Sequence, residues 1–174
     1  MLNSFKLIRL NPNHIIKPFY CGDQDLNDFL FNDAHNYDIG LFAVTYVIEN
    51  PTKTVAFFSV LNDKISSDDF DSNRKFTSLI KNKFPERKKL RSYPAVKIGR
   101  LGIDIEFQNM GLGTQILDYT KQLFVNNNRS GCIFITVDAY QKSLGFYEAN
   151  KFKYFKESLK ENATCPMYFD LTRI

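Results

Sequence analysis

The sequence predicts one α/β domain spanning residues 1–174, built on a mixed sheet. A chain of 174 residues is long enough to bury one sizeable core. Short apolar segments typical of strands alternate with amphipathic segments typical of helices. Residues 95–137 run strand, glycine-containing loop, helix and strand, an order that implies a right-handed crossover.

The amino-terminal part predicts a strand followed by a capped helix. Residues 5–10 alternate apolar and polar side chains, as a half-buried strand does. Cys21-Gly22-Asp23 indicates a turn, and Asp23 is a suitable cap for the helix after it. The apolar stripe of that helix consists of Leu26, Phe29, Leu30 and Ala34.

The next segments predict a β-hairpin and a second helix. Residues 41–48 and 54–61 are rich in β-branched and aromatic side chains, and Asn50-Pro51 separates them. Residues 66–84 carry apolar side chains at helical spacing, without a clear starting point. Pro85 is expected to end this helix, because proline cannot donate the next helical hydrogen bond.

The carboxy-terminal half predicts the alternation of strands and helices that defines the fold class. A strand over residues 95–104 precedes a helix that opens at Gly111 or Leu112. The remaining expected elements are a strand over 132–137 buried on both faces, a short helix over 143–149, and closing strands over 152–155 and 167–171.

Composition points to an ordinary cytoplasmic protein. Apolar residues make up 44% and charged residues 24%, no apolar run reaches the ~20 residues of a membrane helix, and the start lacks a secretory pattern. With 17 Phe and no Trp, a phenylalanine-based core is expected. The three cysteines have no metal-ligand spacing with His14 or His35, so we expect free thiols and no metal.

The positive charge is concentrated in one segment. The net charge is only +4, which does not by itself indicate a nucleic-acid partner. Residues 81–91 contain six basic side chains and one acidic side chain. Such a cluster suits phosphate, in coenzyme A or in RNA, but a solvated helix end and loop explains it equally simply.

Residues 108–114 carry the functional prediction. They lie where the expected strand gives way to the next helix, and they include Gln108-Asn109-Met110-Gly111-Leu112-Gly113. The first amides of a helix have no acceptor within the helix, and the helix dipole adds positive potential there. Gly111 and Gly113 remove Cβ atoms that would hold phosphate oxygens away from the backbone. The segment therefore predicts a diphosphate site.

Two common nucleotide loops are excluded here. No Gly-Lys-Ser/Thr follows, as a Walker A loop requires, and Ile116 stands where G-x-G-x-x-G requires its third glycine. The side chains of Gln108 and Thr114 are further candidate donors. Glycines before a helix also occur for packing alone, so a loop that binds no ligand remains an alternative.

The loop resembles the Q/R-x-x-G-x-G/A acetyl-CoA loop of the GNAT superfamily of N-acetyltransferases. A second segment about thirty residues downstream agrees with this resemblance. Val137-Asp138-Ala139, Ser143 and the run Gly145-Phe146-Tyr147-Glu148-Ala149-Asn150-Lys151-Phe152 resemble the family pattern of a strand followed by a-x-x-F-Y-x-x-x-G-F. Asn150-Lys151 stands where the family has a small residue, usually glycine. Asparagine tolerates a positive φ best after glycine.

The amino-terminal half resembles one GNAT subgroup in particular. Residues 19–30 are similar to its F-x-C-G-x-x-x-L-N-x-F-L opening, and residues 45–47 and 55–60 are similar to its next two strands. This subgroup includes the toxins of toxin–antitoxin pairs that acetylate aminoacyl-tRNA. Arg100 matches an arginine of the same subgroup, and a salt bridge on a sheet face is the alternative explanation for it.

The resemblance implies a fold and a site. The fold is a mixed, mostly antiparallel central sheet, splayed at a cofactor cleft and flanked by helices. Tyr147 matches the family's general acid, while Phe146 is expected mainly to pack, and no general base is evident. The candidate acetyl-CoA contacts are Leu101, Gly102, Ile103, Gln108, Asn109, Met110, Gly111, Leu112, Gly113, Thr114, Asp138, Ser143 and Phe146.

The resemblance also implies partners. The acceptor is a primary amine, with aminoacyl-tRNA, a metabolite and a protein amino terminus as the options. A small antitoxin protein and a homodimer are further partners that the subgroup implies. A non-catalytic acyl-CoA sensor is the alternative function, because a sensor would keep the loop without turnover.

Overall fold

The computed structural model describes residues 2–81, 83, 90–126 and 131–174. It contains a seven-stranded, mostly antiparallel sheet with strand order β1-β2-β3-β4-β5-β7-β6, so the predicted α/β class is confirmed. The strands are β1 (Lys6–Arg9), β2 (Val44–Glu49), β3 (Thr54–Ser66), β4 (Ser92–Ile103), β5 (Phe134–Tyr140), β6 (Lys153–Tyr154) and β7 (Thr164–Asp170). The splay at a cofactor cleft stays a prediction.

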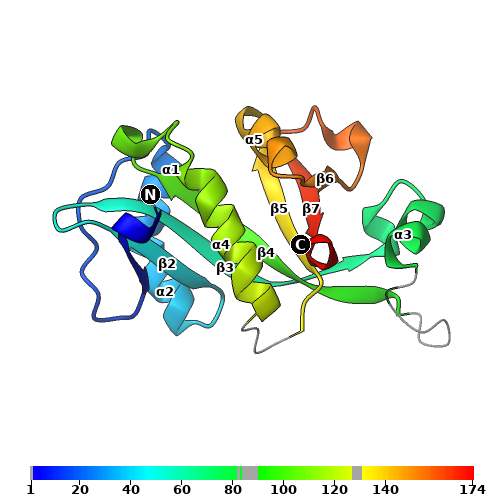
Figure 1. Ribbon diagram of the computed structural model, residues 1–174, viewed down its shortest axis with the longest axis horizontal. Coiled ribbons are helices and arrows are strands. Elements are labelled where there is room, and N and C mark those ends of the chain that lie inside the picture. The colour runs from blue at the N-terminus through cyan, green and yellow to red at the C-terminus, as the bar shows by residue number, and fades with distance from the viewer. Residues whose placement is uncertain (1, 82, 84–89, 127–130) are drawn as a thin grey trace. The chain divides into compact units, whose positions relative to one another are not determined.

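The chain forms two compact units (Figure 1). The first comprises Met1–Leu61 and Ile98–Gln122, and the second comprises Asn62–Lys97 and Leu123–Ile174. The prediction of one domain over residues 1–174 stays a prediction.

The first unit contains the predicted hairpin. Strands β1, β2 and β3 pair antiparallel in succession, with Leu7 opposite Ile48 and Tyr46 opposite Phe58. The Tyr46 and Phe58 rings stack with centroids 5.0 Å apart, a cross-strand contact that helps to fix the register. Strand β3 continues to Ser66, five residues beyond the predicted end.

The predicted amino-terminal helix is present but divided. Helix α1 (Gln24–Asp28) leads through a π-helical turn (Phe29–Asp33) into α2 (Ala34–Ile39). Asp23 caps α1 as predicted, because its carboxylate accepts from the Leu26 amide at 3.4 Å. Phe29, Leu30 and Ala34 of the predicted stripe are all buried, so the stripe packs on the core despite the π turn.

Two adjacent phenylalanines on β3 serve opposite faces of the sheet, since side chains alternate along a strand. Phe57 stacks on Phe29 of the π turn, with centroids 6.0 Å apart. Phe58 meets Tyr119 of α4 (Leu112–Asn126) edge-on at 6.3 Å. The α1–α2 segment and α4 therefore cover opposite faces of the first unit's strands.

An aromatic cluster forms the core of the second unit. Phe70 lies 5.1 Å from Phe155 and 5.5 Å from Tyr168, measured between ring centroids. Both Phe70 and Phe155 are buried, together with Phe76 of α3 (Asn73–Ile80). The expectation of a phenylalanine-based core is confirmed in both units.

The predicted helix over residues 66–84 was too long. A 3-10 helix (Ser67–Asp69) and α3 (Asn73–Ile80) replace it. Ser66 begins the first with a reciprocal capping box to Asp69, and Ser72 begins the second by accepting from the Lys75 amide at 3.3 Å. Helix α3 ends at Ile80, before Pro85, which lies outside the described residues together with Phe84.

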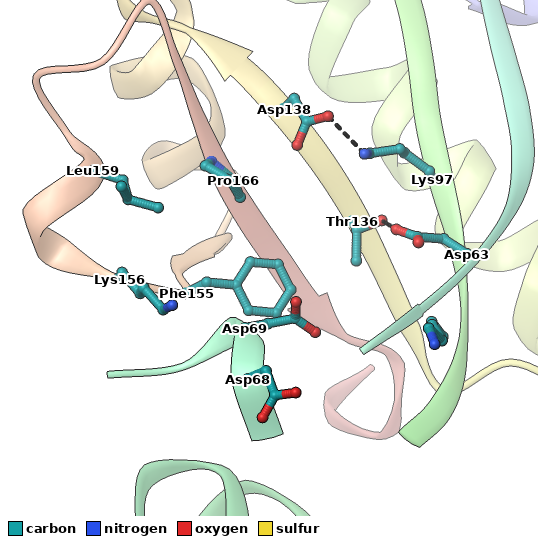
Figure 2. A pocket seen from close by; sticks show the side chains of 11 residues that line it. Asp63, Asp68, Asp69, Lys97, Thr136, Asp138, Phe155, Lys156, Leu159 and Pro166 are labelled. Atoms are coloured by element: carbon teal, nitrogen blue, oxygen red, sulfur yellow. Dashed lines mark hydrogen bonds and ion pairs between the residues drawn. The ribbon is translucent and has the colours of Figure 1, made fainter. Parts of the chain in front are cut away.

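Strand β5 starts at Phe134 and continues to Tyr140, later than the predicted 132–137. Its first four residues are buried, as expected for a strand covered on both faces. Two side-chain contacts tie it to the parts of β3 and β4 that belong to the second unit (Figure 2). The Thr136 hydroxyl donates to Asp63 on β3, and Lys97 on β4 pairs with Asp138 at 2.6 Å.

Candidate functional site

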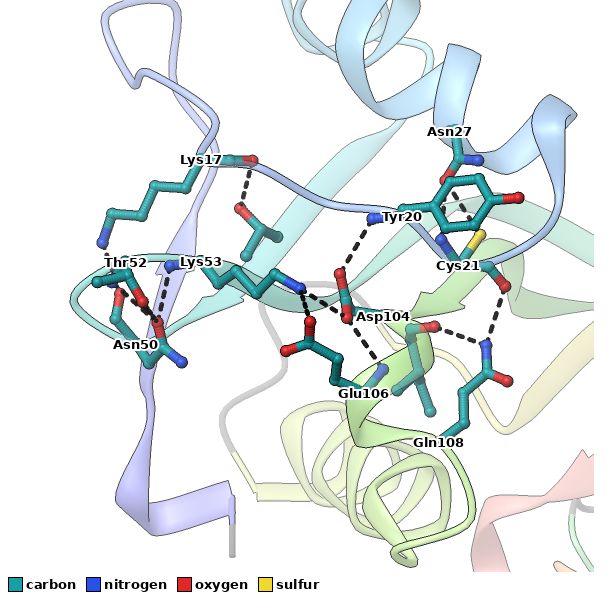
Figure 3. A network of polar contacts seen from close by, with 12 residues as sticks. Lys17, Tyr20, Cys21, Asn27, Asn50, Thr52, Lys53, Asp104, Glu106 and Gln108 are labelled. Atoms are coloured by element: carbon teal, nitrogen blue, oxygen red, sulfur yellow. Dashed lines mark hydrogen bonds and ion pairs between the residues drawn. The ribbon is translucent and has the colours of Figure 1, made fainter.

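The candidate diphosphate loop begins at a buried carboxylate. Strand β4 ends at Ile103, and the amide of Asp104 donates to the Val55 carbonyl at 2.9 Å. The Asp104 side chain is fully buried and accepts from the amides of Tyr20 at 3.0 Å and Glu106 at 3.1 Å (Figure 3). Asp104 thus caps the 3-10 turn Ile105–Phe107, as expected of a residue that ends the strand.

Lys53 compensates the buried charge of Asp104. Its ammonium lies 3.2 Å from Asp104 and 2.8 Å from Glu106. The hydrogen bond to Glu106 raises the pKa of Lys53 against the opposing effect of burial, and Asp104 adds to the rise. Sequence analysis did not identify Lys53, because no sequence pattern indicates that it contacts Asp104, 51 residues further along the chain.

Gln108 holds the loop in place through its side chain. Its Nε2 atom donates to the carbonyls of Cys21 and Ile103, each at 2.9 Å. Both amide hydrogens are therefore used within the protein, and the expectation that this side chain offers a donor to phosphate is corrected. The Gln108 backbone stays a candidate contact.

Gly111 provides open space beside the loop. Its φ is +76°, in the region that strongly favours glycine, and nothing lies within 4 Å of where a Cβ would be. Asn109 also has a positive φ, +60°, which asparagine tolerates better than most residues. Asn109, Met110 and Gly111 are exposed, so this turn presents its backbone outward.

Helix α4 follows with a free amino terminus. Its first helical hydrogen bond runs from the Gln115 amide to the Gly111 carbonyl at 3.3 Å. Within the described ranges, the amides of Leu112, Gly113 and Thr114 have no acceptor. Amides without an acceptor at the positive end of a 15-residue helix favour an anion.

The strand residues before the loop have mixed roles. Gly102 is buried, and an added Cβ would lie 2.6 Å from the Phe57 ring, so its lack of a side chain serves packing. Leu101 and Ile103 are half-buried. Arg100 lies over the Phe29 ring at 5.2 Å, donates to the Gly99 carbonyl and pairs with Asp25 at 3.6 Å. These contacts agree with the alternative explanation of Arg100 as a residue that forms a salt bridge on a sheet face.

Tyr147 belongs to the second unit, on α5 (Leu144–Ala149). Its side chain is 6% exposed, and its ring meets Phe146 at 5.0 Å and Phe152 at 5.3 Å. Burial raises the pKa of Tyr147 far above the ordinary value of a tyrosine. The hydroxyl has no hydrogen-bond partner among the described residues, so it is protonated and uncommitted.

The end of α5 differs in detail from the expectation. Lys151 takes the left-handed conformation, with φ +70°, whereas Asn150 has φ −88°. Asn150 instead fixes the helix end, because its Nδ2 donates to the Phe146 carbonyl at 2.8 Å. Ser143, which precedes α5, and Phe146, within it, are both half-buried.

Asp138 is held by Lys97 and is largely exposed. Its part in cofactor binding stays a prediction. The basic segment 81–91 lies mostly outside the described residues. Of its described members, Lys83 pairs with Asp170 at 2.8 Å.

The remaining polar candidates are explained by local contacts. His14 lies 2.9 Å from Glu49, and His35 lies 3.1 Å from the His14 carbonyl, so both histidines have partners. The three cysteines are free thiols, as predicted. The described residues contain no group of three or more His, Cys, Asp or Glu side chains placed to hold a metal, and no described helix combines the length and apolar character needed to cross a membrane.

Comparison with known proteins identifies the fold. No protein-family model and no curated protein matches the chain. Among solved structures, it is similar to AtaT in complex with acetyl-methionyl-tRNAfMet, with TM-score 0.78, 18% identity, and coverage of 97% of this chain and 96% of AtaT. It is also similar to a tyrosine-to-phenylalanine variant of KacT, with TM-score 0.78, 16% identity, and coverage of 97% and 96%.

A third structure is a tyrosine-to-phenylalanine variant of the AtaT toxin bound to acetyl-CoA and the carboxy terminus of the antitoxin AtaR. It matches with TM-score 0.72 and 18% identity, over 97% of this chain and 94% of the toxin. The agreement extends over nearly the full length of each chain compared. The chain therefore has the GNAT fold of these toxins.

Proposed function

We propose that the protein is an N-acetyltransferase that moves an acetyl group from acetyl-CoA to a primary amine. The observation that carries the proposal is the set of uncommitted amides on Leu112, Gly113 and Thr114, next to the open space at Gly111. This geometry fits the pyrophosphate of coenzyme A. The structure of AtaT with acetyl-CoA and AtaR supports the choice of ligand, since it shares this fold.

Different segments would bind different parts of coenzyme A. The backbone of residues 108–114 would hold the pyrophosphate, with the Thr114 hydroxyl as one further donor. The backbone of Leu101, Gly102 and Ile103 would pair with the amides of the pantetheine arm. Asp138, Ser143 and Phe146 are the remaining proposed contacts, on the second unit.

Acetyl-CoA supplies an activated thioester that an amine can attack. The C–N bond forms as the C–S bond breaks, and the departing sulfur needs a proton. Tyr147 supplies that proton from its hydroxyl, which is protonated because burial raises its pKa and is not engaged elsewhere in the described structure. The proton lost by the attacking amine later restores the phenol through solvent. Two of the structures with this fold are tyrosine-to-phenylalanine variants, which supports the choice of a tyrosine as the proton donor.

Aminoacyl-tRNA is the proposed acceptor. The AtaT complex with acetyl-methionyl-tRNAfMet has the same fold, and residues 81–91 carry six basic side chains. An aminoacyl ester amine has a lower pKa than a lysine amine, so it needs no strong base. By the same comparison, a small antitoxin protein is a proposed partner, and the homodimer stays a proposal.

Isothermal titration calorimetry with acetyl-CoA tests the core of the proposal. We expect binding with one site per chain, and transfer of labelled acetyl from acetyl-CoA to at least one amine class among aminoacyl-tRNAs, polyamines and peptides. Absence of acetyl-CoA binding would exclude both the enzyme and the acyl-CoA sensor.

A salt series tests the tRNA acceptor separately. Affinity for aminoacyl-tRNA is expected to fall steeply between about 50 mM and about 200 mM salt, because phosphate contacts release counterions. If charged tRNA fails to bind even at low salt, the acceptor belongs to another amine class and the transferase proposal still stands.

A further inference from the structure

A cavity of about 260 Å³ lies within the second unit, apart from the diphosphate loop in sequence. Residues of β3, β4 and β5 form its polar wall, and Phe155, Leu159 and Pro166 form an apolar wall (Figure 2). This volume suits a small group, such as one amino-acid side chain with its amine.

Asp63 is the distinctive residue of the polar wall. It is half-buried near the end of β3, and it accepts a hydrogen bond from Thr136. Thr136 is 3% exposed on β5, so the strand fixes the orientation of the carboxylate. Within the part of the chain that the structure describes, Asp63 forms no ion pair with a lysine, arginine or histidine.

Of the other charged groups of the cavity, Lys156 is half-buried on the side of Phe155, and the rest are paired, hydrogen-bonded or exposed. Asp138 is neutralised by Lys97 at 2.6 Å. The Asp69 carboxylate accepts from the amide and hydroxyl of Ser66, at 2.6 and 2.9 Å. Asp68 is exposed and solvated, as is Lys64. Among the described residues, Asp63 and Asp69 are therefore the half-buried carboxylates of this cavity that form no ion pair, and Asp63 is the one that accepts a single hydrogen bond.

We propose that this cavity binds the acceptor as a protonated primary amine, with the ammonium against Asp63 and the adjoining side chain against Phe155. An ammonium has three donors and a full positive charge, which complements an oriented carboxylate in a partly desolvated site. The bound ammonium first loses one proton to solvent and then attacks as the free amine, and the product is a neutral amide, so the site favours substrate over product. The inference rests on the proposed transferase function and names its acceptor pocket.

Nuclear magnetic resonance titration of the full-length, isotope-labelled protein tests this pocket. The probes are leucinamide and N-acetyl-leucinamide, which differ only at the amino group. We expect leucinamide to shift the signals of Asp63, Thr136 and Phe155, and to bind at least about tenfold more tightly than its acetylated form. Equal affinity of the two probes would overturn the inference, as would shifts caused by inorganic phosphate in place of the amine.

Variants assign the effect to Asp63. Asp63→Asn keeps the size and an acceptor for Thr136, and it is expected to abolish the preference for the amine. Asp68→Asn, at an exposed carboxylate of the same cavity, is the matched control and should keep the preference. Thr136→Val should weaken amine binding by about threefold to tenfold, and Thr136→Ser should restore it because the hydroxyl returns. Retained preference in Asp63→Asn would contradict the proposal.

Calorimetry with acetyl-CoA separates this inference from the proposed function. If Asp63→Asn binds acetyl-CoA normally but loses the amine preference, both ideas hold. If the amine preference is absent while acetyl-CoA binds, only the acceptor pocket is wrong. If acetyl-CoA does not bind to the unmodified protein, the transferase function is wrong.

Discussion

Tyr147 combines two features that rarely occur together in a buried tyrosine. Its side chain is 6% exposed, yet its hydroxyl has no partner among the described residues. The hydroxyl oxygen is not among the fully buried, unpartnered polar atoms of the described residues, so it keeps some exposure and is open to a ligand. The arrangement favours a chemical role.

Replacement of Tyr147 by phenylalanine should lower kcat by about 100-fold, because the departing thiolate loses its proton donor. The dissociation constant for acetyl-CoA, measured by calorimetry, should stay unchanged. Tyr140→Phe is the control, since Tyr140 lies nearby in sequence and is exposed. If Tyr147→Phe keeps full turnover, the tyrosine only packs.

Gly111→Ala tests the loop at the level of one Cβ atom. The φ of +76° strains any other residue, so we expect unfolding to be easier by about 1 kcal/mol. The new methyl group also fills the space beside the free amides, so affinity for acetyl-CoA should fall by about tenfold or more. Thermal unfolding and calorimetry measure the two effects.

Gly131→Ala is the matched control for Gly111→Ala. Gly131 also has open space beside it but no positive φ, so it should tolerate alanine in both measurements. Unchanged acetyl-CoA affinity in Gly111→Ala would mean that the diphosphate binds elsewhere.

At the scale of elements, the loop after β4 is fixed by a segment from the amino terminus. The amide of Tyr20 donates to Asp104, and its carbonyl accepts from the Ile105 amide at 2.9 Å. Gln108 completes the attachment through the Cys21 carbonyl. These bonds position the turn that precedes the free amides, so the network of Figure 3 supports the proposed site from behind.

Asp104→Ala should therefore weaken both stability and acetyl-CoA binding. The amides of Tyr20 and Glu106 would lose their acceptor in a buried place, at a cost of about 3 kcal/mol. Denaturant unfolding and calorimetry test the two effects. Glu106→Gln, at the 64% exposed second partner of Lys53, should change either measurement little. Equal effects of the two variants would show that the buried contacts do not organise the loop.

The differences between expected and observed elements have local causes. The helix expected over residues 66–84 is divided because Ser66 and Ser72 each form a cap. Apolar spacing gave no sign of that, because caps are made by polar side chains and the 3-10 helix Ser67–Asp69 contains no apolar residue. At the end of α5, the backbone bond from Lys151 to Glu148 and the side chain of Asn150 decide which residue takes positive φ.

At the scale of the whole molecule, the aromatic core has a consequence for alkaline stability. Burial raises the pKa values of Tyr147 and Tyr168, and raises the pKa of Tyr154 to about 12. In the unfolded chain these phenols ionise near the ordinary tyrosine value of about 10. The folded state therefore keeps these phenol protons up to a higher pH than the unfolded state does.

Stability should therefore be unaffected by these groups below about pH 10 and should fall as the pH rises above it, since the unfolded state then binds fewer protons. Urea unfolding at several pH values, with phenolate absorbance followed in parallel, measures this. We expect the buried tyrosines to ionise together with unfolding. Ionisation of all nine tyrosines in the folded protein near pH 10 would contradict the expectation.

The elements that carry the proposed site could be predicted from local sequence. The loop at residues 108–114, the helix that begins at Leu112 and the short helix carrying Tyr147 lie where the motifs placed them. Lys53 and Asp63 could not be found in this way. Their partners are 51 and 73 residues distant, and charge and hydrogen-bond pairing over such separations leave no periodic pattern.

The sequence by itself determined the order of strands and helices and the glycines before α4, because periodicity and backbone preference act over a few neighbouring residues. Only the tertiary structure decided that the Gln108 side chain binds carbonyls, that Asp104 is fully buried, and that Asp63 lacks an ion-pair partner in the described structure. Those properties depend on which distant segments exclude water from a side chain and which polar atoms they bring to it.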